Sequence, residues 1–285
     1  MLLSSMKRNI FTGVLLCLLL SACSTKLAYN YLDWILEWYV ADLVNLTEDQ
    51  EWQLNEALTK ELAWHRKQQL PLYIKSLDQL SHAINNGLTL ESLQQLYSEQ
   101  LKGWEQLKQH IAPTMAQLFK TMNESQIEQL LANLEERNQE LEEDYVNKPR
   151  NERVEQRQER MVDRIENWTG SLTEAQTQLI SGWSQQIRPL STQWIANRRA
   201  WQTELGSTIR QYRDTSEFSA RIEELFMNDH KYWTESYQTA YHYNLRLTME
   251  MFINLEKQLT DRQRQHLLED IAVLRKHIEE LHNQD

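Results

Sequence analysis

Apolar residues recur every three or four positions along most of this chain, which predicts amphipathic helices rather than strands. Expected helices begin near residues 48, 90, 124, 151, 174, 216 and 261. Pro71 should kink or break the first of them. An apolar seam stays in phase across Pro189, which predicts one kinked helix over residues 174–212. Residues 216–257 contain no breaker, and as one helix they would extend roughly 60 Å.

A short polar motif precedes several of these segments. Its copies read Leu-Thr-x-x-Gln, with one weaker Met-Asn-x-x-Gln copy. Thr or Asn at the N-cap accepts a hydrogen bond from the backbone N–H three residues later, and Gln there reaches back to the N–H of the cap. Each copy therefore predicts a helix start, and the copies form two pairs, near residues 46 and 122 and near 172 and 259. The motif residues are Leu46, Thr47, Gln50, Asn123, Gln126, Leu172, Thr173, Gln176, Leu259, Thr260 and Gln263.

Composition supports an all-α fold. The 285 residues include only 6 Gly and 4 Pro, too few for the turns of an all-β protein. We expect long, partly kinked helices arranged as an elongated bundle or a cradle. The net charge of −11 argues against nucleic acid as a partner.

The N-terminus has the form of an export signal. Lys7 and Arg8 precede an apolar run too short to span a bilayer comfortably, and Leu20-Ser21-Ala22-Cys23 follows. These four residues resemble the bacterial lipobox. The resemblance implies that residues 1–22 are a signal peptide and that Cys23 carries acyl chains, palmitate among them. Ser24 implies sorting to the outer membrane of a Gram-negative bacterium, facing the periplasm.

Residues 27–44 are apolar around nearly the whole circumference of a helix, with Trp34, Trp38 and several tyrosines. Such a helix is normally buried, so we expect the other helices to wrap it. The alternative is an interfacial helix beside the lipid, with Trp and Tyr at headgroup level.

The break at Asn147-Lys148-Pro149 divides the mature chain. We expect a first helical unit over residues 23–146, a charged connecting helix over 147–170 and a second unit over 171–285. An old duplication is one hypothesis for the paired motifs. Arginines line one face of the connecting helix and acids line the next. We expect acid–arginine pairs on a solvated helix, and the alternative is an arginine face for phosphate or carboxylate partners.

Two resemblances follow. The repeated Leu-Thr-x-x-Gln starts in an exported helical chain are similar to the LTxxQ family of periplasmic stress proteins, of the Spy and CpxP type, which form helical cradles and hold unfolded clients without ATP. This chain differs in its lipidation signal, its length and its acidic charge. The phrases Trp64-His65-Arg66, Leu70-Pro71 and Trp168-Thr169-Gly170 resemble a family of proteobacterial lipoproteins of unknown function.

The sequence shows no pattern typical of catalysis. It lacks a His-Glu-x-x-His zinc motif, a Gly-rich phosphate loop and a Gly-x-Ser-x-Gly elbow. We therefore expect no enzymatic activity, no cofactor and no metal. Polar residues on apolar seams usually fix helix register. If a binding site exists, Trp64, His65, Arg66 and Arg198 are the candidates.

The leading functional hypothesis is an ATP-independent envelope chaperone or quality-control adaptor that binds unfolded or envelope proteins. The alternative is a structural lipoprotein that links the outer membrane to a partner complex or the cell wall. In both hypotheses the acyl chains on Cys23 hold the protein at the membrane, and homo-oligomers are possible.

Overall fold

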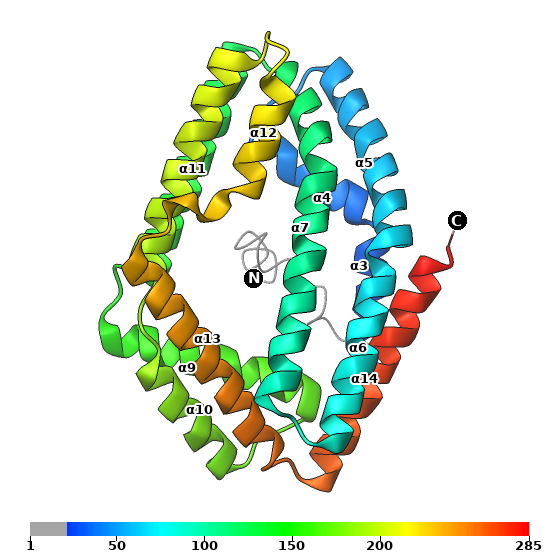
Figure 1. The fold of residues 1–285 in the computed structure, drawn as a ribbon, viewed down its shortest axis with the longest axis vertical. Helices are drawn as coiled ribbons and strands as arrows, with labels where there is room; N and C mark the ends of the chain where they lie inside the picture. Colours follow the sequence, from blue (N-terminus) through cyan, green and yellow to red (C-terminus); the bar gives the residue numbers. More distant parts are fainter. Residues whose placement is uncertain (1–21, 285) are drawn as a thin grey trace.

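A computed structural model describes the backbone of residues 22–284 and the side chains from Lys26 to Gln284. Within that range the fold is all-α, as expected, with turns and loops but no strand (Figure 1). Residues 1–21, which include the first two residues of the lipobox and all but the last residue of the predicted signal peptide, lie outside the described residues. The helices are α3 (Ala22–Asn30), α4 (Leu32–Ala41), α5 (Glu48–Gln68), α6 (Leu70–Asn86), α7 (Leu90–Lys120), α8 (Glu124–Tyr145), α9 (Arg150–Thr169), α10 (Glu174–Gln186), α11 (Ser191–Tyr212), α12 (Phe218–Met227), η1 (Asp229–Tyr232), α13 (Glu235–Glu256) and α14 (Asp261–His282).

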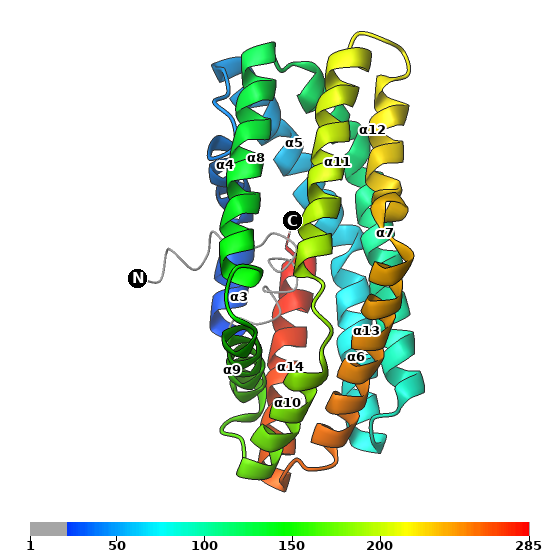
Figure 2. The same ribbon diagram turned by 90° about the vertical axis from the view of Figure 1, so that its left-hand side faces the viewer.

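The helices form an elongated body with two sides. Figure 2 places α3, α4, α8 and α9 on one side and α7, α12 and α13 on the other. The most extensive helix–helix contacts join α7 to α12, α6 to α14 and α8 to α11. No helix in the described part of the chain is both long and apolar enough to cross a membrane.

All four motif copies begin helices, which confirms the capping prediction. Thr47, Asn123, Thr173 and Thr260 are the N-caps of α5, α8, α10 and α14, and each has a full capping box with the Gln three residues later. Thr89 forms an equivalent box with Ser92 at α7. Gly87 and Gly170, with φ of 87° and 73°, follow α6 and α9, where a side chain would be strained.

The motif glutamines also pair with one another across the fold. Gln50 Nε2 donates to Gln126 Oε1 at 3.1 Å, and Gln126 Nε2 donates back to Gln50 Oε1 at 2.6 Å. Gln176 and Gln263 form the same reciprocal pair, with both distances 2.9 Å. The first pair joins the starts of α5 and α8, and the second joins the starts of α10 and α14, at the opposite end of the long axis (Figure 2).

Each glutamine amide makes one more bond, to a backbone carbonyl two residues before the N-cap of the partner helix. Gln176 Nε2 donates to the carbonyl of Gln258, and Gln263 Nε2 donates to that of Ser171, both at 2.9 Å. Gln50 and Gln126 repeat this arrangement with Thr121 and Asn45. All four side chains are buried, so each amide is both a cap and a joint between two chain segments.

The apolar faces of the described helices are divided among three separate clusters. The first surrounds Ile127, Leu205 and Ile222, where α7, α8, α11 and α12 meet. The second surrounds Leu77 and Leu274, between α3, α6 and α14. The third lies between α9, α10 and α13. The first two clusters draw residues from both expected helical units, so the break at residues 147–149 does not separate two cores.

Two long helices predicted from the seams are in fact interrupted. Residues 187–190 are not helical, because Pro189 disfavours the helical conformation of the residue before it, and α10 and α11 are separate helices. Residues 216–257 are divided into α12, η1 and α13. Trp233 is extended and Thr234 caps a new helix by accepting from Tyr237 N at 3.2 Å. An apolar seam can keep its phase through a short break, so periodicity alone missed both.

The expectation that residues 27–44 form a wrapped core helix is wrong. They form α3 and α4, and α4 contains no buried residue. Leu32 and Val40 of α4 are partly buried against the second and first clusters, while Trp34 and Trp38 stay exposed, so the helix is covered on one side only.

We predict that Gln176→Leu lowers the free energy of unfolding by about 2–4 kcal/mol, because it leaves the amide of Gln263 and the carbonyl of Gln258 buried without partners. Urea and thermal unfolding at neutral pH would measure this. Gln126→Leu should have a similar cost at the other end of the body.

Gln178→Leu is the matched control, because Gln178 is exposed two residues along the same helix. If Gln176→Leu and Gln178→Leu unfold at the same urea concentration, the glutamine pair does not stabilise the fold.

Candidate functional site

The most prominent surface feature is a line of exposed apolar side chains on α3 and α4. Leu27, Tyr31, Trp34 and Trp38 follow the 4-3-4 spacing of one helix face, and they are 61%, 62%, 64% and 47% exposed. Hydrogen bonds from Tyr31 N to Leu27 O and from Ile35 N to Tyr31 O carry the helical pattern across the junction. We call these four residues the aromatic stripe. Contiguous apolar surface of this kind marks an interaction site.

The opposite side of α3 is fastened to the body. Tyr29 is buried among residues of α6 and α14. Its hydroxyl lies 2.9 Å from His65 Nδ1 on α5, and the Tyr73 hydroxyl of α6 lies 3.4 Å from His65 Nε2. Lys26 Nζ is 2.8 Å from a carboxylate oxygen of Glu280 on α14. These contacts fix the direction in which α3 presents its outer face.

The C-terminal end of α4 is held by α8. Arg137 donates to Asp42 Oδ2 at 2.6 Å, and its guanidinium lies 4.3 Å from the centre of the Tyr39 ring. Asn133 Nδ2 donates to the carbonyl of Leu43 at 2.9 Å. Burial raises the pKa of Tyr39, so the phenol stays neutral here. The aromatic stripe is therefore held at both ends while its outer face has no cover among the described residues.

Trp64, His65 and Arg66, predicted as one possible binding site, make three separate contacts. Trp64 stacks on His110 of α7, with ring centres 3.7 Å apart. His65 contacts the two tyrosines described above. The Arg66 guanidinium lies 5.7 Å from the Tyr29 ring, and its carbonyl accepts from His282 Nδ1 at 2.8 Å. The three residues join α5 to α3, α6, α7 and α14.

Arg198 belongs to a buried polar network between α8 and α11. Its Nε donates to Asn138 Oδ1 at 3.2 Å, and Asn138 Nδ2 donates to Gln202 Oε1 at 2.6 Å. The guanidinium lies 5.1 Å from the Trp194 ring centre, and burial lowers the pKa of Arg198. Asn138 and Gln202 are buried as well. A network of this type fixes helix register, the role expected for polar seam residues.

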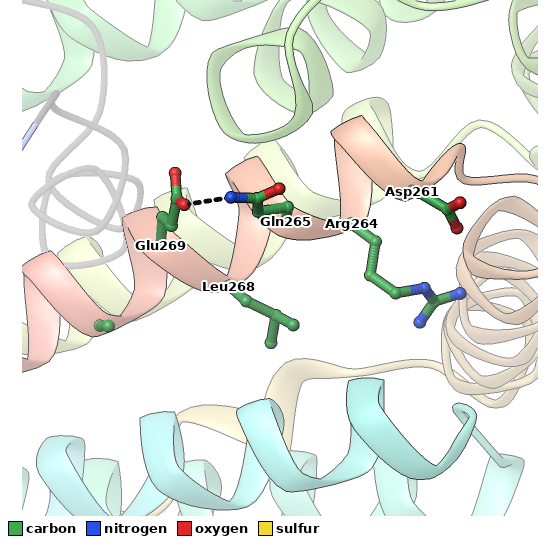
Figure 3. A pocket seen from close by; sticks show the side chains of 6 residues that line it. Asp261, Arg264, Gln265, Leu268 and Glu269 are labelled. Atoms are coloured by element: carbon green, nitrogen blue, oxygen red, sulfur yellow. Dashed lines mark hydrogen bonds between the residues drawn. The ribbon is translucent and has the colours of Figure 1, made fainter.

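A shallow pocket lies on α14 (Figure 3). Three of its polar side chains already have partners: Arg264 is paired with Glu256 at 2.5 Å, and Gln265 donates to Glu269 at 2.8 Å. The pocket therefore offers a ligand few free polar groups. Its lining residues are Asp261, Arg264, Gln265, Leu268, Glu269 and Ala272.

Comparison with known proteins gives one match. A model of a family of unknown function, DUF6279, matches residues 42–238, more than half of the chain. The chain belongs to this family. No curated protein and no solved structure matches it. The family match covers α5 to α12 and the first turn of α13, and it begins just after the aromatic stripe.

Sequence reasoning located the aromatic residues but assigned them to the core. The available signal was the 4-3-4 spacing of Leu27, Tyr31, Trp34 and Trp38, with a second apolar face around Tyr29 on the same helix. Two apolar faces fit a wrapped helix and a two-sided interface equally well. Cys23 lies in the first turn of α3, one helix before Trp34.

We predict that the His65 contact makes stability depend on pH. Burial lowers the pKa of His65 to about 4, so the folded protein keeps the ring neutral while the unfolded chain binds a proton below about pH 6.5. The contribution of His65 to the free energy of unfolding is therefore fully present above about pH 6.5. It is lost as the pH falls towards 4, and the total loss is about 3 kcal/mol.

Urea unfolding of wild type and His65→Gln at pH 7 and pH 4.5 would measure this difference, because Gln does not titrate. The wild type should lose more stability than the variant. His82→Gln, at an exposed position on α6, is the control and should follow the wild type. Parallel pH profiles for wild type and His65→Gln would contradict the prediction.

Proposed function

We propose that this protein is a lipid-anchored scaffold on the periplasmic face of the outer membrane, and that the aromatic stripe lies in the membrane interface. The exposed Trp34, with Tyr31 and Trp38 beside it on the same face, is the observation that carries the proposal. Trp and Tyr rings favour the headgroup region because one part of the ring is apolar and the other forms hydrogen bonds.

The position of the stripe in the chain supports this function. Cys23, the residue of the lipobox resemblance, begins the same helix that carries Leu27. Acyl chains on Cys23 would already attach the protein to the membrane. The stripe would then set the orientation of the body, because α3 and α4 are fixed to α5, α8 and α14 by the contacts described above.

The distribution of apolar side chains favours a scaffold over a client-binding cradle. The three clusters use the inner faces of α6 to α14, together with Tyr29 of α3 and Val44 after α4. In α5 to α14, the large apolar side chains that remain exposed are scattered: Trp52, Leu101, Tyr243 and Val273. A cradle for unfolded chains needs a broad apolar surface. In this protein, adjacent exposed apolar side chains occur only along the aromatic stripe of the described residues.

An ATP-independent chaperone is the second candidate, because the aromatic stripe is also the kind of surface that binds unfolded segments. The two functions compete for the same residues. A stripe seated in the bilayer would not hold clients, so the location of the stripe decides between them.

We predict that brominated lipids quench the fluorescence of Trp34 and Trp38. The mature lipoprotein would be placed in phosphatidylcholine vesicles with bromine near the headgroup end of the acyl chains. Trp34→Phe/Trp38→Phe should lose most of the quenching seen in the wild type. Trp52→Phe is the control, since Trp52 on α5 is 65% exposed but lies outside the stripe.

Equal quenching in wild type and the double variant would mean that the stripe does not reach the bilayer. The anchor is tested separately: Cys23→Ser should move the protein from the membrane fraction to the soluble periplasmic fraction. The proposal for the stripe and the proposal for the lipid anchor can thus be contradicted independently.

We also predict that the vesicle-bound lipoprotein does not suppress the aggregation of a reduced, denatured client at equimolar ratio. Light scattering measures this, with Trp34→Ser/Trp38→Ser as the comparison. Suppression by the vesicle-bound wild type, lost in that double variant, would favour the chaperone function over the scaffold.

A further inference from the structure

Helix α9 carries an unusual concentration of one cationic residue. Five of its 20 residues are arginine and none is lysine. Arg153, Arg157, Arg160 and Arg164 follow a 4-3-4 spacing along one side of the helix, over roughly 16 Å at 1.5 Å per residue. We call these four residues the arginine stripe. Acids occupy the adjacent side of the helix, at Glu152, Glu155, Glu159, Asp163 and Glu166.

The acid–arginine pairs expected for this helix are not formed. Within the described residues, no acidic oxygen lies within 4.0 Å of any nitrogen of the arginine stripe. Pairing is more common elsewhere in the described chain, where eight of the twelve arginines outside α9 lie within 4.0 Å of an acid: Arg137, Arg199, Arg210, Arg213, Arg221, Arg246, Arg264 and Arg275. Arg153, Arg157 and Arg164 are half-buried beside neighbouring helices, whereas Arg160 and most of the acids on the adjacent side are exposed.

The stripe is held by contacts that leave its charge uncompensated. Arg157 donates from one terminal nitrogen to the carbonyl of Ser184 on α10 at 2.8 Å. The Arg160 guanidinium lies 5.4 Å from the Tyr145 ring at the end of α8. Arg153 Nε is buried without a hydrogen-bond partner. These contacts orient the guanidinium groups but provide no anion.

Burial and mutual repulsion act against these charges. Desolvation is the main cause that lowers the pKa of both Arg157 and Arg164, and neighbouring arginines lower it further. A partly buried cation without a counter-charge is destabilising, so a group of them marks a surface completed by an anion.

We propose that the arginine stripe binds an acidic segment of a protein partner, through carboxylates that face Arg153, Arg157, Arg160 and Arg164. The proposal rests on the scaffold function and names the chemistry of the partner that the scaffold would hold. Guanidinium groups bind carboxylates through two parallel N–H donors, which gives both orientation and affinity.

The surroundings of the stripe favour a narrow ligand. The acids on the adjacent side of α9 and the net charge of −11 repel a broad anionic surface such as a bilayer. A single extended or helical segment can follow a row of four arginines without approaching those acids. The stripe also has the length of about three helical turns, which suits carboxylates repeated every three or four residues.

The test uses the mature lipoprotein in neutral detergent and a fluorescein-labelled deca-glutamate peptide, with binding measured by fluorescence anisotropy at low and physiological ionic strength. We expect saturable binding that weakens with salt. Arg157→Gln/Arg160→Gln/Arg164→Gln should bind at least about ten-fold more weakly, because it removes three charged contacts. The triple Lys variant at these positions should fall between it and the wild type, since Lys lacks the planar fork.

Arg246→Gln is the matched control, because Arg246 is exposed on α13 and forms only an i,i+4 pair with Glu250, 2.9 Å away. Its affinity for the peptide should equal that of the wild type. Thermal unfolding shows whether each variant is folded, and loss of three repelling charges should not lower the unfolding temperature.

The proposal would be overturned by no saturable binding of deca-glutamate by the folded wild type, or by equal binding by the triple Gln variant. Inorganic phosphate or phosphatidylglycerol vesicles that displace the peptide more strongly than free glutamate peptide would assign the stripe to phosphate instead. Lipid quenching of Trp34 and membrane fractionation should be unchanged in the α9 variants, so this proposal and the membrane proposal fail separately.

Discussion

The reciprocal hydrogen bonds of two glutamine pairs are the constraint on which the arrangement of this protein depends. Each amide has two donors and an acceptor oxygen with two lone pairs, and all are used: for its own helix start, for the partner amide and for a carbonyl of the partner segment. A serine three residues after the N-cap can also complete a capping box, as Ser92 does with Thr89 at α7. Its hydroxyl does not form the reciprocal hydrogen bonds that join two helix starts. The glutamine therefore couples local helix initiation to tertiary structure.

These joints matter because the helices do not share one large core. Three modest apolar clusters lie between different sets of helices, and the glutamine pairs connect helix starts at the two ends of the body. A buried polar joint is specific, because a shift by one residue would leave several donors unpaired. Small cores and specific joints together stabilise an elongated body without a single compact interior.

The two surfaces proposed for function share one physical property, since both are unfavourable in the isolated chain. The aromatic stripe exposes large rings to water, and the arginine stripe keeps charges close together without anions. Each is held in position by ordered contacts, Tyr29 with His65 for the first and Arg157 with Ser184 for the second. Such surfaces become favourable when a membrane or a partner completes them, which is the property that the proposed scaffold function requires.

The sequence by itself determined where the helices with a motif copy begin, because a cap such as Thr173 with Gln176 is a local interaction among four residues. It also determined the all-α class, the helix end at Gly170 and the break at Pro71, which depend on backbone preferences alone. It did not reveal the interruptions at residues 187–190 and 228–234, since an apolar seam can continue in phase through a short break. Only the tertiary structure decided that Gln176 meets Gln263, that Trp34 faces outward and that the arginines of α9 form no ion pairs with the acids of the same helix. Those outcomes depend on which helices pack together. Two residues that are separated by 82 or 87 positions in the chain cannot be paired from the local sequence around either one.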